Sequence, residues 1–352
     1  GNMNRHLKAI GLSIFSTLIL ATAARAETLD QLYAKAKQEG ALEIYGGGGK
    51  AGTQAAADAF MKRFPGIKVT AHGDFSNVLD NEIDKQIADK HVTADYIQFQ
   101  TIEDYWRWDH EGALLRWKPE GFAEVYDNMK ATDGSWVATN ANPLFYGYNP
   151  DKVAAADVPQ SALDFLKPQF KGQMVTAYPA DDDATLYNFY LIEKKYGTAW
   201  LTKYLANGGH FIQGHRDVTA RVRSGADSLS FDITNGSQTN GPGPNGNLKI
   251  AMSPKDQTVV FYTAGAILKD APHPNAAKLY LQWQLSKEIQ GKNPLLYSPR
   301  RDVPPPAGMP PLTSKRFAND YRGFEGDGSR ITQIRQRYLA ITGPVVNKAT
   351  VP

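Results

Sequence analysis

A run of four glycines and a lysine is the local feature of this sequence with the clearest chemical consequence. The run comprises Gly46, Gly47, Gly48, Gly49 and Lys50. Glycines let the backbone approach a ligand closely, and exposed N–H groups at the start of a helix form a concavity that binds anions. The alternative is a flexible turn. A nucleotide-binding P-loop does not fit, because Ala51 stands where that loop needs serine or threonine.

Polar residues recur near the ends of other predicted elements. They are Gln98, Gln100 and Thr101; Tyr178, Asp182, Asp183 and Thr185; His215 and Arg216; and Asp232 and Tyr262. Arg216 suits a carboxylate or phosphonate, which a guanidinium binds through two hydrogen bonds. The aspartates suit an amine, so a zwitterionic solute would satisfy both sets. The alternatives are helix capping by the aspartates, a surface ion pair for Arg216 and hinge packing for Tyr262.

Enzyme chemistry finds little support in the sequence. There is no G-x-S-x-G nucleophile motif, and His110-Glu111 lacks the second histidine of a zinc-binding helix. The sequence contains no cysteine, so thiol ligands and disulfides are excluded. We therefore predict a protein that binds a solute without changing it and needs no cofactor or metal. A secreted hydrolase, with catalytic residues brought together only by folding, is the alternative.

The first 26 residues have the three parts of a secretory signal. Arg5 and Lys8 give a positive start, a short apolar stretch follows, and the small residues of Ala24–Ala26 form the exit. Gly1 and Asn2, ahead of the methionine, are interpreted as a remnant of cloning. Without a cysteine there is no site for a lipid anchor. The sequence therefore predicts a protein that diffuses in the periplasm.

Charge and length set broad limits on partners and size. The 39 basic and 36 acidic residues nearly balance, leaving a net charge of +3. A nucleic-acid-binding protein concentrates basic residues on one face, so we predict no nucleic-acid partner. After removal of the signal, the chain is long enough for two lobes of ordinary domain size.

The order of predicted elements indicates an α/β fold. Apolar spacing predicts helices in 29–36, 55–64, 186–196, 218–223 and 276–285, and strands in 42–45, 67–69, 95–97, 172–176 and 228–231. Strand, helix and strand in succession form the unit of a parallel sheet. Two apolar runs, 142–150 and 258–262, are predicted to cross between structural units. Residues 235–247, rich in Gly, Asn and Pro, are predicted to be an exposed loop.

Six segments together match the pattern of a known family in order and spacing. They are Leu42–Lys50, Phe64–Val69, Ala94-Asp95, Glu111–Leu115, Tyr148–Pro150 and Lys269–Leu279. They resemble the iron(III)-type periplasmic solute-binding proteins of ATP-binding-cassette importers. The resemblance implies a two-lobed, type 2 periplasmic-binding-protein fold, each lobe a mixed, mainly parallel sheet flanked by helices. Residues 27–144 plus 262–352 would form lobe one and residues 145–261 lobe two, joined by two hinge strands.

The resemblance also implies a function. A monomer would capture a small-molecule solute between the lobes and deliver it to the membrane permease of an importer; a ligand-sensing subunit of a membrane receptor is the alternative. Ferric members of the family bind iron through a histidine, a glutamate and a tyrosine pair. Those positions correspond here to Gly49, Gln100 and the stretch Asp232–Asn235. We therefore expect an anionic or zwitterionic solute instead of directly bound iron(III).

Overall fold

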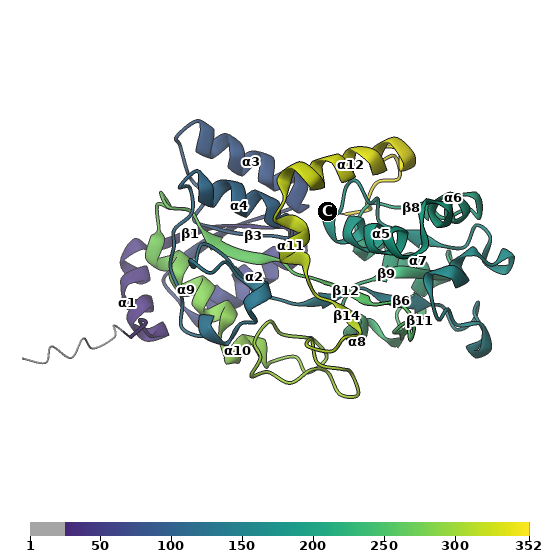
Figure 1. Cartoon of the computed structure of the whole chain (residues 1–352). Helices are drawn as coiled ribbons and strands as arrows, with labels where there is room; N and C mark the ends of the chain where they lie inside the picture. The colour runs from purple at the N-terminus through teal and green to yellow at the C-terminus, as the bar shows by residue number, and fades with distance from the viewer. Residues whose placement is uncertain (1–24, 352) are drawn as a thin grey trace, which may run out of the picture.

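The computed structural model describes residues 25–351. Two groups of strands, each flanked by helices, lie next to one another along the molecule (Figure 1). The predicted signal peptide, residues 1–26, falls almost entirely outside the described residues. Within residues 25–351, no helix combines the length and the apolar character that crossing a membrane would require.

The first lobe is built on a five-stranded sheet with the order β2-β1-β3-β13-β4. Its strands are β1 (Ala41–Gly46), β2 (Lys68–Gly73), β3 (Tyr96–Phe99), β4 (Val137–Ala138) and β13 (Ala264–Ile267). Strand β1 pairs in parallel with β2 and β3, whereas β13 runs antiparallel to β3 and β4. Leu42 and Ile44 of β1 are both almost fully buried, as expected for residues two apart that share a core face.

Helices pack on this sheet and close its core. They are α1 (Leu29–Glu39), α2 (Lys50–Arg63), α3 (Ser76–Ala88), α4 (Ile102–His110), α9 (Pro274–Leu285) and α10 (Lys287–Gln290). Helix α1 starts at a capping box between Thr28 and Gln31, and it packs against α9. The Phe60 and Tyr280 rings, 5.2 Å apart, join α2 to α9 in the core. Short 3-10 turns at 122–124 and 127–129 lead from this lobe toward β4.

The second lobe has a sheet with the order β10-β11-β6-β9, and the short pair β7-β8 lies beside β9. Its strands are β6 (Phe145–Tyr148), β7 (Val175–Thr176), β8 (His210–Phe211), β9 (Leu229–Ile233), β10 (Gly241–Gly243) and β11 (Gly246–Ala251). Its helices are α5 (Asp183–Tyr196), α6 (Thr198–Ala206), α7 (His215–Ser224) and α8 (Gly236–Thr239), with 3-10 turns at 155–157, 162–166 and 168–170. Strands β9 and β11 both run antiparallel to β6, β7 and β8 pair in parallel, and a parallel bridge joins Met174 to Leu229 of β9. The four-stranded sheet of this lobe is therefore antiparallel, whereas a mainly parallel sheet was predicted. The reason is that β6 enters from the first lobe and β9 and β11 run beside it in the opposite direction.

The stretch 235–247 is largely exposed, as predicted, but the prediction that it is a loop was wrong. It contains α8 and β10, and β10 forms a hairpin with β11. Asn245 and Gly246, at the hairpin turn, both have positive φ angles, 68° and 131°. Glycine and asparagine tolerate that backbone, so the composition that suggested a loop reflects the needs of a tight hairpin turn.

A small sheet links the two lobes. Its strands are β5 (Asn142–Pro143), β12 (Thr258–Phe261) and β14 (Phe317–Ala318), with β12 between the other two. The predicted lobe boundaries, 144/145 and 261/262, fall at the ends of β5 and β12 and remain a prediction. Beyond β14, α11 (Tyr321–Glu325) contacts α4, and α12 (Gly328–Thr342) contacts α5 of the second lobe (Figure 1).

Candidate ligand-binding cleft

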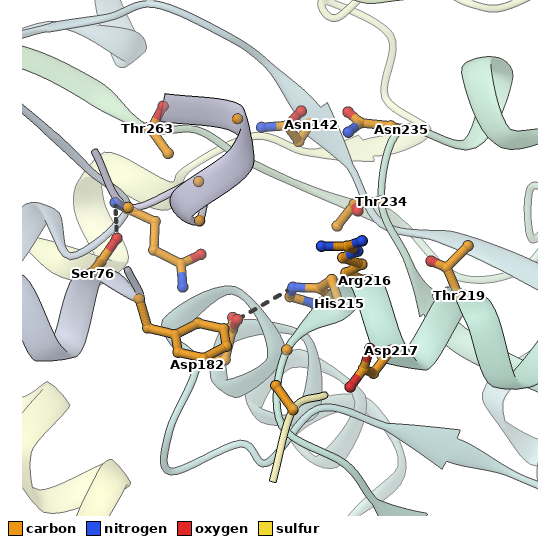
Figure 2. A pocket seen from close by; sticks show the side chains of 18 of the residues that line it. Ser76, Asn142, Asp182, His215, Arg216, Asp217, Thr219, Thr234, Asn235 and Thr263 are labelled. Atoms are coloured by element: carbon orange, nitrogen blue, oxygen red, sulfur yellow. Dashed lines mark hydrogen bonds and ion pairs between the residues drawn. The ribbon is translucent and has the colours of Figure 1, made fainter. Parts of the chain in front are cut away.

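A cavity of about 620 Å³ lies between the lobes. Its walls come from the starts of α2 and α3 in the first lobe, from the start of α7 in the second, and from Asn142 and Thr263 in the linking region (Figure 2). This volume is typical of a pocket for a small organic molecule. A cleft walled by both lobes is where a hinge motion would enclose a solute.

The glycine run forms one wall where β1 leads into α2. Gly49 precedes the helix with φ 91°, a conformation that glycine tolerates, and no side chain caps the helix start. Gly47 cannot carry a side chain without displacing a neighbour, because a Cβ there would lie 2.0 Å from Ser76 Oγ. A side chain at position 47 would therefore force Ser76 to move. The first N–H groups of a helix have no partner within it, and Ala51 and Gly52 of the first turn of α2 line the cavity.

Two more helices start at the same cavity without a side-chain cap. Helix α3 begins after Phe75, and α7 begins after Gly214, whose φ is 83°. A Cβ on Gly214 would lie 3.0 Å from the Phe75 ring, so these two starts touch across the cleft. Each helix start carries partial positive charge. Three of them around one cavity favour a negatively charged occupant.

His215 lies between two buried aspartates at the base of α7 (Figure 2). Its Nε2 is 2.8 Å from Asp232 Oδ1, and its Nδ1 is 3.2 Å from Asp182 Oδ2. Burial disfavours the charged imidazole, but the two carboxylates outweigh burial and raise the pKa of His215 well above its usual value. Burial likewise opposes ionisation of Asp182, yet His215 and the backbone N–H of Thr185 hold the pKa of Asp182 below its usual value. The three residues therefore form an ion cluster held together within the protein.

Arg216 follows His215 and reaches the cavity wall from an exposed position. Among residues 25–351, no carboxylate lies within ion-pair distance of its guanidinium. The cavity aspartates all have partners: Asp181 accepts from Asn77 at 2.8 Å, Asp182 pairs with His215, and Asp217 binds Thr350. Arg216 is thus the lining residue best placed to pair with an incoming anion.

Part of the predicted residue set lines the cavity. These residues are Gly47, Gly48, Gly49, Gln100, Asp182, His215 and Arg216. They come from four separate stretches of sequence that the fold brings together. Ligand contact by these residues remains a prediction.

The remaining predicted residues are not in the wall of this cavity. They are Gly46, Lys50, Gln98, Thr101, Tyr178, Asp183, Thr185, Asp232 and Tyr262. The Gln98 side chain accepts a hydrogen bond from Tyr96, and the Lys50 side chain is exposed on α2. Gly46 lies one residue short of the wall, packed against Thr53. Ligand contact by these residues also remains a prediction.

Burial explains several of these displaced positions. Thr185 and Asp232 have no exposed surface and bond each other at 2.8 Å, and Asp232 also accepts from the backbone N–H of Ala177. The Tyr262 hydroxyl donates to the Asn128 carbonyl inside the first lobe. Tyr178 is also buried, and its hydroxyl accepts from the backbone N–H of Asn347. These residues therefore lie near the cleft, as their positions at strand ends predicted, but their side chains make hydrogen bonds within the protein.

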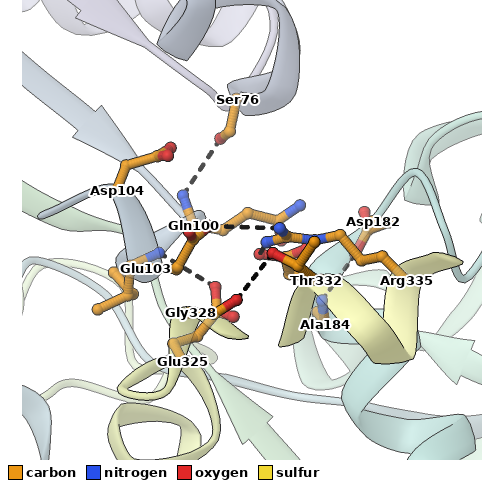
Figure 3. Close-up of polar contacts among 12 residues, drawn as sticks. Ser76, Gln100, Glu103, Asp104, Asp182, Ala184, Glu325, Gly328, Thr332 and Arg335 are labelled. Carbon is orange, nitrogen blue, oxygen red and sulfur yellow. Dashed lines mark hydrogen bonds and ion pairs between the residues drawn. The ribbon is translucent and has the colours of Figure 1, made fainter. Parts of the chain in front are cut away.

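Thr101 and Asp183 line a second pocket, of about 260 Å³, which shares Asn77 and Asp181 with the first. Figure 3 shows Glu103, Asp104 and Arg335 of its wall. Its walls are unusually acidic and carry two arginines: Asp80, Asp84, Glu103, Asp104, Asp181, Asp183, Arg107 and Arg335. Burial first, and then neighbouring Asp80, raise the pKa of Asp104 well above its usual value. Within the part of the chain that the structure describes, no group of three or more His, Asp or Glu side chains could hold a metal ion.

Sequence reasoning missed several residues of the cavity wall. They are Phe75, Ser76 and Asn77 at the start of α3, Asn140, Asn142 and Thr263 in the linking region, Thr234 and Asn235 after β9, and Ala349 and Val351 near the C-terminus. Thr234 and Asn235 fall in the stretch that corresponds to the family's tyrosine pair, so the resemblance contained a signal for them. The start of α3 carries no composition signal, because Phe-Ser-Asn is ordinary loop sequence.

Residues 55–319 match the family described as bacterial extracellular solute-binding protein. The chain belongs to this family. An Fe(3+)-binding periplasmic protein from Serratia marcescens is 24% identical over 286 residues, which cover 78% of this chain and 80% of that relative. The family and this relative confirm the resemblance to iron(III)-type periplasmic solute-binding proteins.

Solved structures of similar fold confirm the type 2 periplasmic-binding-protein architecture. Iron-bound HitA from Pseudomonas aeruginosa has a TM-score of 0.68 at 21% identity, covering 85% of this chain and 99% of HitA. AfuA from Actinobacillus pleuropneumoniae, with exogenous fructose-6-phosphate bound, has a TM-score of 0.71 at 15% identity, covering 86% of this chain and 98% of AfuA. The family match thus makes the protein an extracellular solute-binding protein, and these structures show its fold.

Proposed function

We propose that this solute-binding protein captures a small organic anion, carrying a phosphate, phosphonate or carboxylate group, for an ATP-binding-cassette permease. The observation that carries the proposal is the meeting of three uncapped helix starts, those of α2, α3 and α7, at one cavity beside Arg216. Backbone N–H groups at such starts bind anionic oxygens, and the helix dipoles favour negative charge. The guanidinium of Arg216 would add a bidentate contact.

The donor set of the cavity argues for an organic anion over bare iron(III). Gly49 and Gln100 supply no charge at two positions where ferric relatives carry ligands. The aspartates in the wall are already engaged by Asn77, His215 and Thr350. AfuA, which shares the fold, has fructose-6-phosphate in its structure. That precedent supports an organic phosphate as one member of the proposed class.

The sequence predicted an anionic or a zwitterionic solute, and the structure gives less support to the amine of a zwitterion than to its acidic group. Asp183 and Asp232 are out of reach of the cavity, and Asp182 is neutralised by His215. Asp181 remains at the wall, where burial and the nearby Asp182 raise its pKa while its bond to Asn77 opposes the shift. Asp181 already accepts from Asn77, and burial weakens its negative charge, so it gives only weak support for a cationic group on the solute.

The lobes are proposed to close on the solute by a hinge motion about the linking strands β5 and β12. Two contacts already join the lobes at the cleft: Asn77 donates to Asp181, and the Phe75 ring packs on Gly214. Closure would exclude water from the anion and strengthen its contacts.

Substitution of Arg216 tests the anionic class. Screening by thermal shift against inorganic phosphate, sugar phosphates, phosphonates, carboxylates, amines and neutral sugars should identify a stabilising class, because a ligand at 100 times its Kd adds about 2.7 kcal/mol. Arg216→Ala should then lower the affinity for that compound by about 10- to 150-fold. This is the effect of losing a charge-assisted hydrogen bond worth about 1.5–3 kcal/mol. Calorimetric titration measures the change.

Lys50→Ala is the matched control. It removes the same charge next to the glycine run, but the Lys50 side chain is exposed and is not part of the cavity wall. We expect a change of less than about threefold, from long-range electrostatics alone. Equal losses in the two variants, or stabilisation only by amines or neutral sugars, would refute the proposed class.

A further inference from the structure

The segment after α12, residues 343–351, lies at the rim of the cleft. It runs back from α12 along the second lobe, and Ala349 and Val351 complete the cavity wall on the side of α7. We call residues 343–351 the rim segment. Its hydrogen bonds to the second lobe are part of no helix and no sheet. Most of them involve a side chain, so particular side chains hold the segment in place.

Asn347 is the first anchor of the rim segment. Its backbone N–H donates to the Tyr178 hydroxyl at 3.0 Å, its carbonyl accepts from the N–H of Gln213 at 2.9 Å, and its side chain donates to the Phe211 carbonyl at 3.1 Å. The N–H of Ala349 then donates to the Gln213 side chain at 3.1 Å. These bonds fix the segment along the chain that leads from β8 into α7.

Thr350 is the second anchor, and it binds a charged residue of the cavity. Its N–H donates to Asp217 Oδ2 at 2.7 Å and its hydroxyl donates to Asp217 Oδ1 at 3.0 Å. Asp217 is the third residue of α7, where an acidic side chain commonly turns back to cap the helix start. Here both oxygens of the buried carboxylate accept hydrogen bonds from Thr350 in the rim segment, and no side chain caps the start of α7.

We infer that the rim segment is a specificity wall: it sets the size of solute that fits over α7, and Thr350 positions Asp217 so that its charge stays off the anion. The size limit rests on the cavity alone. The charge effect rests on the anionic solute proposed above. The segment lies outside residues 55–319, which match the family.

The absence of cysteine allows the wall to be tested without any ligand. Thr219, on α7 in the cavity wall, is changed to cysteine as a reporter. Its alkylation by iodoacetamide, which is small, and by fluorescein maleimide, which is bulky, is timed in three backgrounds: full-length, a chain ending at Gly343, and Thr350→Val. Shortening the chain should speed labelling by the bulky reagent several-fold more than labelling by the small one.

Binding supplies the second readout, with inorganic phosphate and glucose 6-phosphate as probes. In the shortened chain, the affinity ratio should shift toward glucose 6-phosphate. Thr350→Val should lower the affinity for both probes by roughly fivefold. Without the Thr350 hydroxyl, Asp217 Oδ1 is free to turn toward the start of α7, where its negative charge would repel the anion. Thr350→Ser keeps the hydroxyl and should match the parent. A role in folding alone would lower stability without altering the size ratio.

The two readouts separate failure of this inference from failure of the proposed function. If the parent binds no anion, the anionic class is wrong, while the labelling ratio still decides whether the segment is a wall. If shortening the chain speeds both reagents equally, or neither, the wall is refuted. If Thr350→Val leaves both phosphate affinities unchanged in a parent that binds them, the positioning role of Thr350 is refuted.

Discussion

Replacing His215 with glutamine is expected to lower the free energy of unfolding by about 3–5 kcal/mol near pH 6, because it removes the cation between two buried carboxylates. Asp232 has no exposed surface and Asp182 is only 8% exposed, so water cannot compensate for the lost charge. Urea unfolding followed by tryptophan fluorescence measures the loss. Adding Asp232→Asn to His215→Gln should recover part of it, since an uncompensated buried charge disappears.

The cost of this substitution should depend on pH with a definite sign. The folded-state pKa of His215 is raised well above its usual value, so its contribution is fully present below about pH 6.5, the value in an unfolded chain. The contribution falls as pH rises from there through the raised folded pKa, by up to about 1.4 kcal/mol per unit. The lowered pKa of Asp182 adds a loss only below about pH 3.8. A cost that is constant from pH 6 to pH 9 would show that His215 is neutral in the folded protein.

The fold was largely predictable because its signals are local. Apolar spacing indicated the helices around α2, α5, α7 and α9, and the Pro65-Gly66 stop lies two residues beyond the end of α2. Sheet direction in the second lobe was less predictable. Whether β6 pairs parallel or antiparallel depends on where the chain returns, and that is decided by contacts far apart in sequence.

The candidate site shows the same contrast between local features, which the sequence predicts, and contacts between distant residues, which it does not. The position of the glycine run was predicted from the sequence: it ends at the start of a helix, and Gly47, Gly48 and Gly49 line the cavity. Side-chain roles were predicted less well, because a carboxylate at a strand end can face a ligand or an internal partner. Asp232 bonds His215 and Thr185, and Asp183 bonds Arg335, a partner 152 residues away. No local pattern shows such a partner.

Substitution of Arg335 is expected to have the second large effect on the free energy of unfolding. Arg337, on the same helix α12, provides the control. Its guanidinium binds both oxygens of Asp183, at 2.9 and 2.7 Å, and Glu103 at 3.2 Å (Figure 3). It therefore joins α12 to α5 of the second lobe and α4 of the first. Nearby Glu325 is fully buried, and burial followed by the Asp183 carboxylate raises the pKa of Glu325 well above its usual value, while Arg335 opposes this shift. Arg335 is thus the cation among three crowded carboxyl groups.

Arg335→Ala is expected to cost about 3 kcal/mol in unfolding free energy, because Asp183, whose side chain is 6% exposed, would lose its cation. Arg337→Ala should cost less than about 1 kcal/mol. Arg337 also makes a bidentate pair, at 2.5 and 2.6 Å to Glu193, but its side chain is 43% exposed and Glu193 keeps a bond from Tyr338. Urea unfolding of both variants decides the comparison. The arginines differ in exposure, 26% for Arg335 and 43% for Arg337, whereas both carboxylate partners are largely buried. If the two substitutions cost the same, exposure of the arginine does not determine the energy of these pairs, and Arg335 is only a surface contact of α12.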